Sequence, residues 1–201
     1  MMDIVMPQNN EEQLIAMAER LGYTALCFLY SPDEYINKPQ KTKDFGEKIK
    51  ICFGVLADSK NIGGIKGKLK GEKIFIAVKS SGNDRQIIEG AKPDMVFSFE
   101  ESPRKDFIHH RASGLNHILC KLAKEKKVAI GFSLSLILND KNRHVILGRM
   151  MQNIMLCEKF KLKTMIASFA QEPYEMRSVH DIKSLFEILG GKNMHFSKET
   201  A

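Results

Sequence analysis

The strongest constraint on the fold is the regular return of short, unbroken hydrophobic runs along the chain. Seven runs are rich in residues that favour β-strands, at residues 4–6, 24–29, 49–56, 74–78, 95–99, 128–132 and 165–168. Most of them show little alternation between hydrophobic and polar residues, which is typical of strands buried on both faces of a parallel sheet. The sequence therefore predicts seven buried, parallel strands.

Helical periodicity separates several of these runs. After Asn10, hydrophobic residues at positions 14, 17, 18 and 21 share one helical face. Asn10 and Gln13 fit a capping box, and Gly22 can end the helix. Hydrophobic spacing and end signals predict three further helices, over residues 113–126, 143–160 and 178–190.

The alternation of strands and helices implies right-handed crossovers and an α/β fold with a parallel sheet, either open or closed as a barrel. Seven strands along the whole chain favour a TIM-barrel-like fold. A standard eight-stranded barrel uses about 250 residues, so this chain predicts a small barrel with irregular helices. No domain boundary is visible, and residues 1–201 are expected to form one domain. Residues 60–73 lack a helical period and predict a mobile connection or a hairpin-like excursion.

Composition narrows the class of protein. Hydrophobic residues make up 43% of the chain and charged residues 27%, as in ordinary globular proteins. Lys and Arg number 31 against 24 Asp and Glu, a formal charge of +7 that favours polyanionic partners. No hydrophobic run approaches the roughly 20 residues of a membrane span, and no secretory signal is recognisable. Four dispersed cysteines are expected to be reduced core thiols of a cytoplasmic protein.

Sequence motifs of a metal-dependent or nucleotide-dependent enzyme are missing. The six histidines form no H-x-H, H-E-x-x-H or H-x-x-E-H pattern. Asp3, Glu100 and Glu101 place carboxylates near predicted strand ends, but carboxylates are common there. Neither a G-x-S-x-G elbow, a dinucleotide fingerprint nor a P-loop is present. We therefore expect no metal site and no catalytic residue in this chain.

The predicted helix over residues 113–126 has a cationic outer face. His117, Lys121 and Lys124 fall opposite its hydrophobic residues, with Lys126 and Lys127 just beyond. Such a stripe can neutralise several phosphates. The plainer interpretation is the solvated face of an outer barrel helix, which needs no ligand.

Two sequence blocks resemble a known family. The pattern R-x-S-G-L-N-H-x-L-C at residues 111–120 and the pattern S-F-A-x-x-P-x-E-M-R at residues 168–177 are similar to archaeal ribonuclease P protein component 3. The eukaryotic relative of that family is the thirty-kilodalton ribonuclease P subunit. The N-terminal half is similar more loosely, through MDIVMPQNN, LGYTALCF and KPDMVFSFE.

The resemblance implies a barrel related to metal-dependent phosphoesterase barrels of the PHP type, and a place in the endonuclease that removes the 5′ leader of precursor tRNA. In that enzyme the RNA performs the chemistry with RNA-bound Mg²⁺, so this chain is expected to bind no cofactor. Its expected partners are the ribonuclease P RNA, a small RRM-like protein called component 2 and other ribonuclease P proteins. Precursor tRNA would be reached only indirectly.

The expected role of the chain is to bind and stabilise the catalytic RNA. On the matching motif positions, the resemblance implies RNA contacts by Arg111, Asn116, His117, Lys121, Lys127, Arg149, Lys159 and Arg177. Two alternatives stay open: a metal-dependent phosphoesterase of the same barrel type, and a protein-interaction scaffold that barely touches RNA.

Overall fold

All seven predicted strands are present in the computed structural model, which describes residues 1–37, 48–58, 61–68 and 74–192. The strands are parallel and neighbour one another in chain order, from β1 to β7. Their bounds are β1 Met2–Val5, β2 Ala25–Tyr30, β3 Lys50–Ala57, β4 Phe75–Lys79, β5 Met95–Phe97, β6 Ala129–Ser133 and β7 Thr164–Ala167.

The sheet curls until its first and last strands nearly meet. Val5 forms a parallel bridge with Ala170, just beyond β7. The Phe169 amide donates to the Ile4 carbonyl oxygen, and the Met6 amide donates to the Ala170 carbonyl oxygen, each at 2.8 Å. These bonds make the sheet a nearly closed, seven-stranded barrel.

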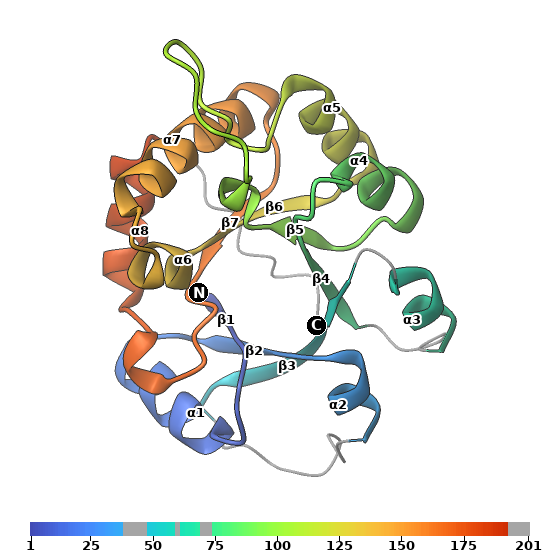
Figure 1. Ribbon diagram of the computed structural model, residues 1–201. Coiled ribbons are helices and arrows are strands. Elements are labelled where there is room, and N and C mark those ends of the chain that lie inside the picture. The colour runs from blue at the N-terminus through green and yellow to red at the C-terminus, as the bar shows by residue number, and fades with distance from the viewer. Residues whose placement is uncertain (38–47, 59–60, 69–73, 193–201) are drawn as a thin grey trace.

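Helices surround the strands on the outside, as Figure 1 shows. The longest is α7 (Arg143–Phe160), which has the bounds predicted from its hydrophobic spacing. Ser178 caps α8, as its sequence indicates, by accepting a hydrogen bond from the Asp181 amide at 3.1 Å. The other elements are α1 Glu11–Arg20, α2 Pro32–Asn37, α3 Ile62–Lys68, α4 Asp84–Gln86, α5 His117–Lys126, α6 Leu134–Asn139, α8 Val179–Ile188, the π-helix η1 Ile87–Ala91 and the 3-10 helices η2 Phe99–Glu101 and η3 Pro173–Glu175.

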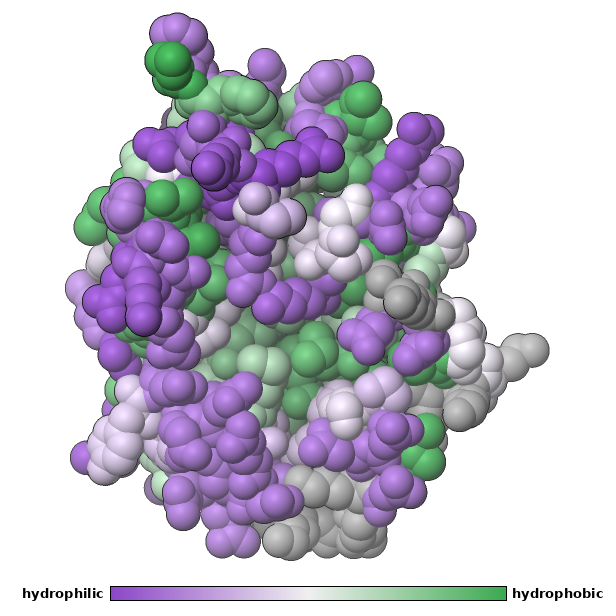
Figure 2. Space-filling view, in the orientation of Figure 1, coloured by the Kyte–Doolittle hydropathy of each residue, from purple (hydrophilic) through white to green (hydrophobic). Residues whose placement is uncertain are grey.

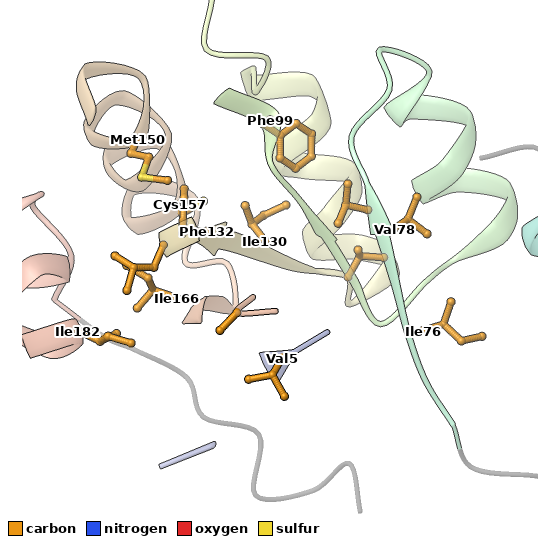
Figure 3. Close-up of a cluster of buried hydrophobic side chains, with 14 of the residues drawn as sticks. Val5, Ile76, Val78, Phe99, Ile130, Phe132, Met150, Cys157, Ile166 and Ile182 are labelled. Atoms are coloured by element: carbon orange, nitrogen blue, oxygen red, sulfur yellow. The ribbon is translucent and has the colours of Figure 1, made fainter. Parts of the chain in front are cut away.

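Hydrophobic side chains fill both faces of the sheet. Inside the barrel, the rings of Phe97 and Phe169 stack with their centroids 4.3 Å apart. Between the sheet and the helices, strand residues such as Phe132 pack with Met150 of α7 and Ile182 of α8 (Figure 3). Burial on both faces is the physical reason why the strands lack a hydrophobic–polar alternation.

The predicted capping box at the start of α1 is wrong. The Asn10 side chain does not cap the helix. Its Nδ2 donates to the carbonyl oxygen of Gln171 at 2.9 Å, and its Oδ1 accepts from the Gln8 amide at 2.9 Å. Asn10 therefore ties the β1–α1 connection to the segment after β7, a contact between distant parts of the chain that local sequence does not reveal.

The prediction of a helix-free connection at residues 60–73 is also wrong for its central part. Residues 62–68 form α3, in which Ile62 and Ile65 are both buried in the outer core. Packing of these two residues outweighs the low helix propensity of three glycines. The rest of that segment lies outside the described residues, apart from Asn61.

All four cysteines have free thiols; Cys27, Cys120 and Cys157 are buried, and Cys52 is half-buried. Among the described residues, no helix is both long enough and hydrophobic enough to span a membrane.

Candidate functional site

A pocket of about 630 Å³ opens at the carboxyl ends of β4 and β5. Ser80 follows β4 and Ser98 follows β5, at the edge where α/β barrels carry their ligand sites. Ser98 turns the chain there with a φ of +60°. The opposite wall comes from residues 102–116, here named the rim loop, and from the first turn of α5. In Figure 1 the rim loop is the yellow-green segment that projects between α7 and α5.

Arg149 of α7 anchors the rim loop. Its side chain is buried, and its guanidinium donates to the carbonyl oxygens of Glu100, Ser102 and Arg104. Its Nε donates to Oδ1 of Asp106 at 2.9 Å. These bonds take up the guanidinium, so Arg149 positions the loop and does not face solvent. This burial argues against the expected RNA contact of Arg149.

Asp106 links this anchor to Arg111. Its carboxylate accepts from the Ala112 amide at 2.9 Å and lies 3.5 Å from a guanidinium nitrogen of Arg111. Burial acts to raise the pKa of Asp106, but the Ala112 amide and the two arginines lower it overall. Arg111 crosses α7 at Gly148, where an added Cβ would stand 2.5 Å from Cζ of Arg111. The Arg111 guanidinium, half exposed, is thereby held at the mouth of the pocket.

Two residues set where α5 begins. Gly114 has a φ of +82°, and a Cβ there would stand 2.3 Å from the Phe99 carbonyl oxygen. Asn116 caps the helix, because its Oδ1 accepts from the amides of Ile118 at 3.0 Å and Leu119 at 2.9 Å. The helix predicted from residue 113 therefore begins only at residue 117. Its positive N-terminal end borders the pocket.

The structure brings four of the predicted RNA contacts together. Arg111 and Asn116 line the pocket. His117 is the first residue of α5, and Lys121 lies about one helical turn further along. Both side chains are exposed. These four residues, here named the pocket edge, lead from the pocket wall onto α5, with the exposed Ile118 among them.

Three other predicted contacts lie elsewhere. Lys127 follows α5 just before β6, and Lys159 lies near the end of α7 before β7, so both are at the amino ends of the strands. Arg177 precedes α8 and donates to the carbonyl oxygens of Tyr174 at 2.7 Å and Met176 at 2.8 Å. The pocket and these three residues therefore do not form one surface.

Several pocket residues were not found from the sequence. Arg85, Arg104, Phe107 and His110 all line the pocket. Three of them lie in the stretch R-K-D-F-I-H-H-R at residues 104–111, whose density of basic and aromatic residues is a usable signal. Arg85 comes from α4, and only the fold brings it to this edge.

Cations exceed anions on the pocket wall. Asp84 is buried and accepts hydrogen bonds from Ser80 Oγ at 2.9 Å and the Ser81 amide at 3.3 Å. Glu101 forms an ion pair with Lys79, with Nζ 2.6 Å from Oε2. Against these two acids stand the arginines at positions 85, 104 and 111. Such a wall favours an anionic ligand.

Of the three carboxylates expected near strand ends, Glu101 lines this pocket, whereas Asp3 and Glu100 do not. Asp3 is buried between β1 and β7, where its oxygens accept from the Ser168 amide and hydroxyl at 2.7 Å each; burial raises the pKa of Asp3 to about 6. Glu100 is buried against Asn153 of α7. Across the described ranges, no three His, Cys, Asp or Glu side chains gather closely enough to hold a metal ion.

A model of the family described as RNase P subunit p30 matches residues 1–199. This chain belongs to the RNase P subunit p30 family. It is 25% identical over 189 residues to Ribonuclease P protein component 3 of Methanosarcina barkeri, covering 91% of this chain and 76% of that protein. The corresponding protein of Methanococcus vannielii is 29% identical over 189 residues, covering 89% and 79%. The chain is thus a ribonuclease P protein subunit.

Two solved structures share the fold of this p30-family chain. One belongs to the cryo-EM structure of archaeal Ribonuclease P with mature tRNA, with a TM-score of 0.75, 23% identity and coverage of 95% of this chain and 83% of that chain. The other is histidinol phosphate phosphatase of Lactococcus lactis with zinc, L-histidinol and phosphate, with a TM-score of 0.66, 10% identity and coverage of 96% and 95%. The predicted TIM-barrel-like fold is confirmed, and a phosphatase barrel shares it.

Proposed function

We propose that this p30-family subunit binds the catalytic RNA of ribonuclease P at the pocket edge and stabilises the RNA fold that removes the 5′ leader of precursor tRNA. The observation that carries the proposal is the cationic wall at the carboxyl ends of β4 and β5, joined to the positive end of α5. A phosphate group binds most favourably where several cations lie beside a helix N-terminus.

The proposal assigns hydrolysis to magnesium ions held by the RNA, and gives this chain neither a cofactor nor a catalytic residue. Its own contribution is electrostatic. Arg111 and Lys121 lie along the pocket edge, where they would replace counterions of the RNA backbone, and His117 beside them would offer a hydrogen bond. An RNA neutralised in this way keeps its active fold at a lower magnesium concentration.

The proposed partners follow the family resemblance. We expect a small RRM-like component 2 to act as a pair with this chain, beside other ribonuclease P proteins, while precursor tRNA is reached through the RNA. Lys127 and Lys159, at the amino ends of the strands, would need a second RNA contact, and so would Arg177.

Reconstitution tests this function. The catalytic RNA is incubated at low magnesium with this chain, with the RRM-like partner, or with both, and cleavage of a precursor tRNA is followed. We expect cleavage only when all three components are present. Lack of rescue would contradict the subunit role, and phosphoester turnover by the protein alone would support the phosphoesterase alternative.

Substitutions at the pocket edge separate RNA binding from a pure scaffold role. The double variant His117→Gln and Lys121→Gln removes two exposed groups from α5. Its control is Lys183→Gln, which removes an exposed cation from α8, away from the pocket. We expect the double variant alone to need more magnesium for cleavage. Unchanged cleavage by both would favour the scaffold alternative.

A further inference from the structure

An exposed aromatic ring stands on the wall of the cationic pocket. Phe107 is 70% exposed and lines the pocket, and Ile118 at the start of α5 is 53% exposed and lines it too. Exposure of large hydrophobic side chains beside one cavity indicates a ligand with an apolar face. The cations and the apolar side chains of this pocket therefore call for a ligand that is both anionic and flat.

The rim loop holds Phe107 in place. The Phe107 amide donates to the His110 carbonyl oxygen at 2.7 Å, and the His110 amide donates to the Phe107 carbonyl oxygen at 3.4 Å. This pair of hydrogen bonds closes a tight turn. The Arg149 and Asp106 bonds fix the stem of the same loop. Figure 2 shows the loop projecting at the top of the molecule, with hydrophobic and hydrophilic side chains side by side at its tip. The ring is thus presented before any ligand arrives, which lowers the entropy cost of binding.

Charged groups line the same pocket as the ring. The Arg104 and Arg111 side chains lie on the same loop and the same pocket. Within the described residues, the Arg104 guanidinium has no hydrogen-bond or ion-pair partner. Ser98 and Ser113 add hydroxyl groups on the pocket wall. The pocket that Phe107 lines therefore also offers a phosphate a charge partner and hydrogen-bond donors.

We propose that this pocket takes a single unpaired nucleotide of RNA, with its base against Phe107 and its phosphate toward Arg104 and Arg111. The proposal rests on the proposed RNA-binding function and adds the ligand class of this site. Unstacked bases are the parts of RNA that aromatic side chains recognise, and a paired base inside a duplex is not available to the ring. Because every base has a π-face, the pocket tolerates different bases.

A protein ligand fits these observations less well. A hydrophobic protein surface would use Phe107 and Ile108 equally, since Ile108 is 95% exposed at the tip of the same turn. Only Phe107 lines the cationic pocket. The two neighbours therefore form a matched pair that distinguishes the two classes of partner.

The test uses the full-length chain and a short single-stranded RNA that carries one fluorescent adenine analogue, whose emission falls when it stacks on an aromatic ring. We expect quenching by the unsubstituted chain, by Phe107→Tyr and by Ile108→Ala. Phe107→Ala should lose the quenching and bind the strand roughly 5- to 150-fold more weakly, the range measured for loss of one stacked base. A duplex of the same length should show no effect of Phe107→Ala.

Three results would overturn the nucleotide site. The first is that Phe107→Ala and Ile108→Ala bind the single strand with equal affinity. The second is that Phe107→Ala loses as much affinity for the duplex as for the single strand. The third is that both variants bind RNA unchanged but fail to bind other ribonuclease P proteins. The last result would assign the turn to a protein partner. Reconstituted cleavage reports separately on the subunit role, because its failure with the unsubstituted chain would contradict that role whatever the fluorescence shows.

Discussion

Arg149 of α7 and Asp106 of the rim loop form a hydrogen bond, with Nε of the arginine 2.9 Å from Oδ1 of the aspartate, although 43 positions separate them in the chain. The pair connects α7 to the loop that carries the pocket wall. The arginine side chain is 7% exposed and the aspartate side chain 22%. Their bond makes the shape of the candidate site depend on a residue that faces no ligand.

Replacement of Arg149 by methionine is expected to destabilise the protein strongly. It leaves three carbonyl oxygens of the loop stem without their donor, and each buried group left unpaired typically costs about 1–3 kcal/mol. Urea unfolding measures the loss. Lys159→Met, on the exposed side of the same helix, is the control and should change stability by less than about 0.5 kcal/mol. Similar stabilities of the two variants would show that Arg149 does not anchor the loop.

Glu100 predicts a pH-dependent stability. Its Oε1 accepts from Asn153 Nδ2 at 2.7 Å, whereas its Oε2 and the Asn153 Oδ1 have no hydrogen-bond partner among the residues that the structure describes. Burial raises the pKa of Glu100 from 4.5 to about 7. The folded state thus holds the proton more tightly than the unfolded state. The protonated Glu100 therefore contributes to the stability of the folded state in full below pH 4.5, and this contribution is lost as the pH rises through about 7.

Glu100→Gln tests this dependence. A glutamine keeps the shape, cannot ionise and offers a donor that the carboxylate lacks. We expect the free energy of unfolding of the variant, measured with urea, to rise relative to that of the unsubstituted protein between pH 4.5 and about 7. At higher pH the difference should reach roughly 3 kcal/mol. The neighbouring Glu101→Gln, which removes an exposed ion pair with Lys79, should show no such gain. A difference that stays constant with pH would refute a protonated Glu100.

Gly114 and Gly22 form a natural comparison, because both have a φ of +82°. A Cβ at Gly22 would meet no atom of the described part of the chain within 4 Å, whereas a Cβ at Gly114 would stand 2.3 Å from the Phe99 carbonyl oxygen. Gly22→Ala should therefore cost only the backbone strain of about 1 kcal/mol. Gly114→Ala should cost a further 1–3 kcal/mol or so. Thermal unfolding checks the order, and equal melting temperatures would mean that the loop adjusts freely.

The hydrophobic pattern predicted the barrel because short hydrophobic runs directly indicate which strands are buried. Seven strands and the bounds of α7 follow from spacing alone. The helix of residues 62–68 was missed because the packing of Ile62 and Ile65 decides it. The capping box failed because the Asn10 side chain is held elsewhere: its Oδ1 accepts from the Gln8 amide and its Nδ2 donates to the Gln171 carbonyl oxygen. Local sequence does not show which distant groups will meet.

The candidate site was predicted only in part for the same reason. Motif positions identified Arg111 and Asn116, which line the pocket, but gave Arg149 the same role. The residue type alone does not show whether an arginine in a helix faces solvent or the carbonyl oxygens of a loop. Phe107 carries no sequence mark of exposure, because an aromatic residue is ordinarily expected in the core.

Salt dependence distinguishes the two ends of the barrel as RNA contacts. Lys121 lies on α5 near the pocket, and Lys127 lies beyond the other end of the helix, about 9 Å further along its axis. Each phosphate contact that is lost lowers the slope of log affinity against log salt by roughly 0.7 on a single strand. Lys121→Gln should lower the slope for a short single-stranded RNA by about this amount, and Lys127→Gln should leave it unchanged. Equal slopes for the two variants would show that the strand does not bind at the pocket edge, and a lower slope only for Lys127→Gln would move the contact to the amino ends of the strands.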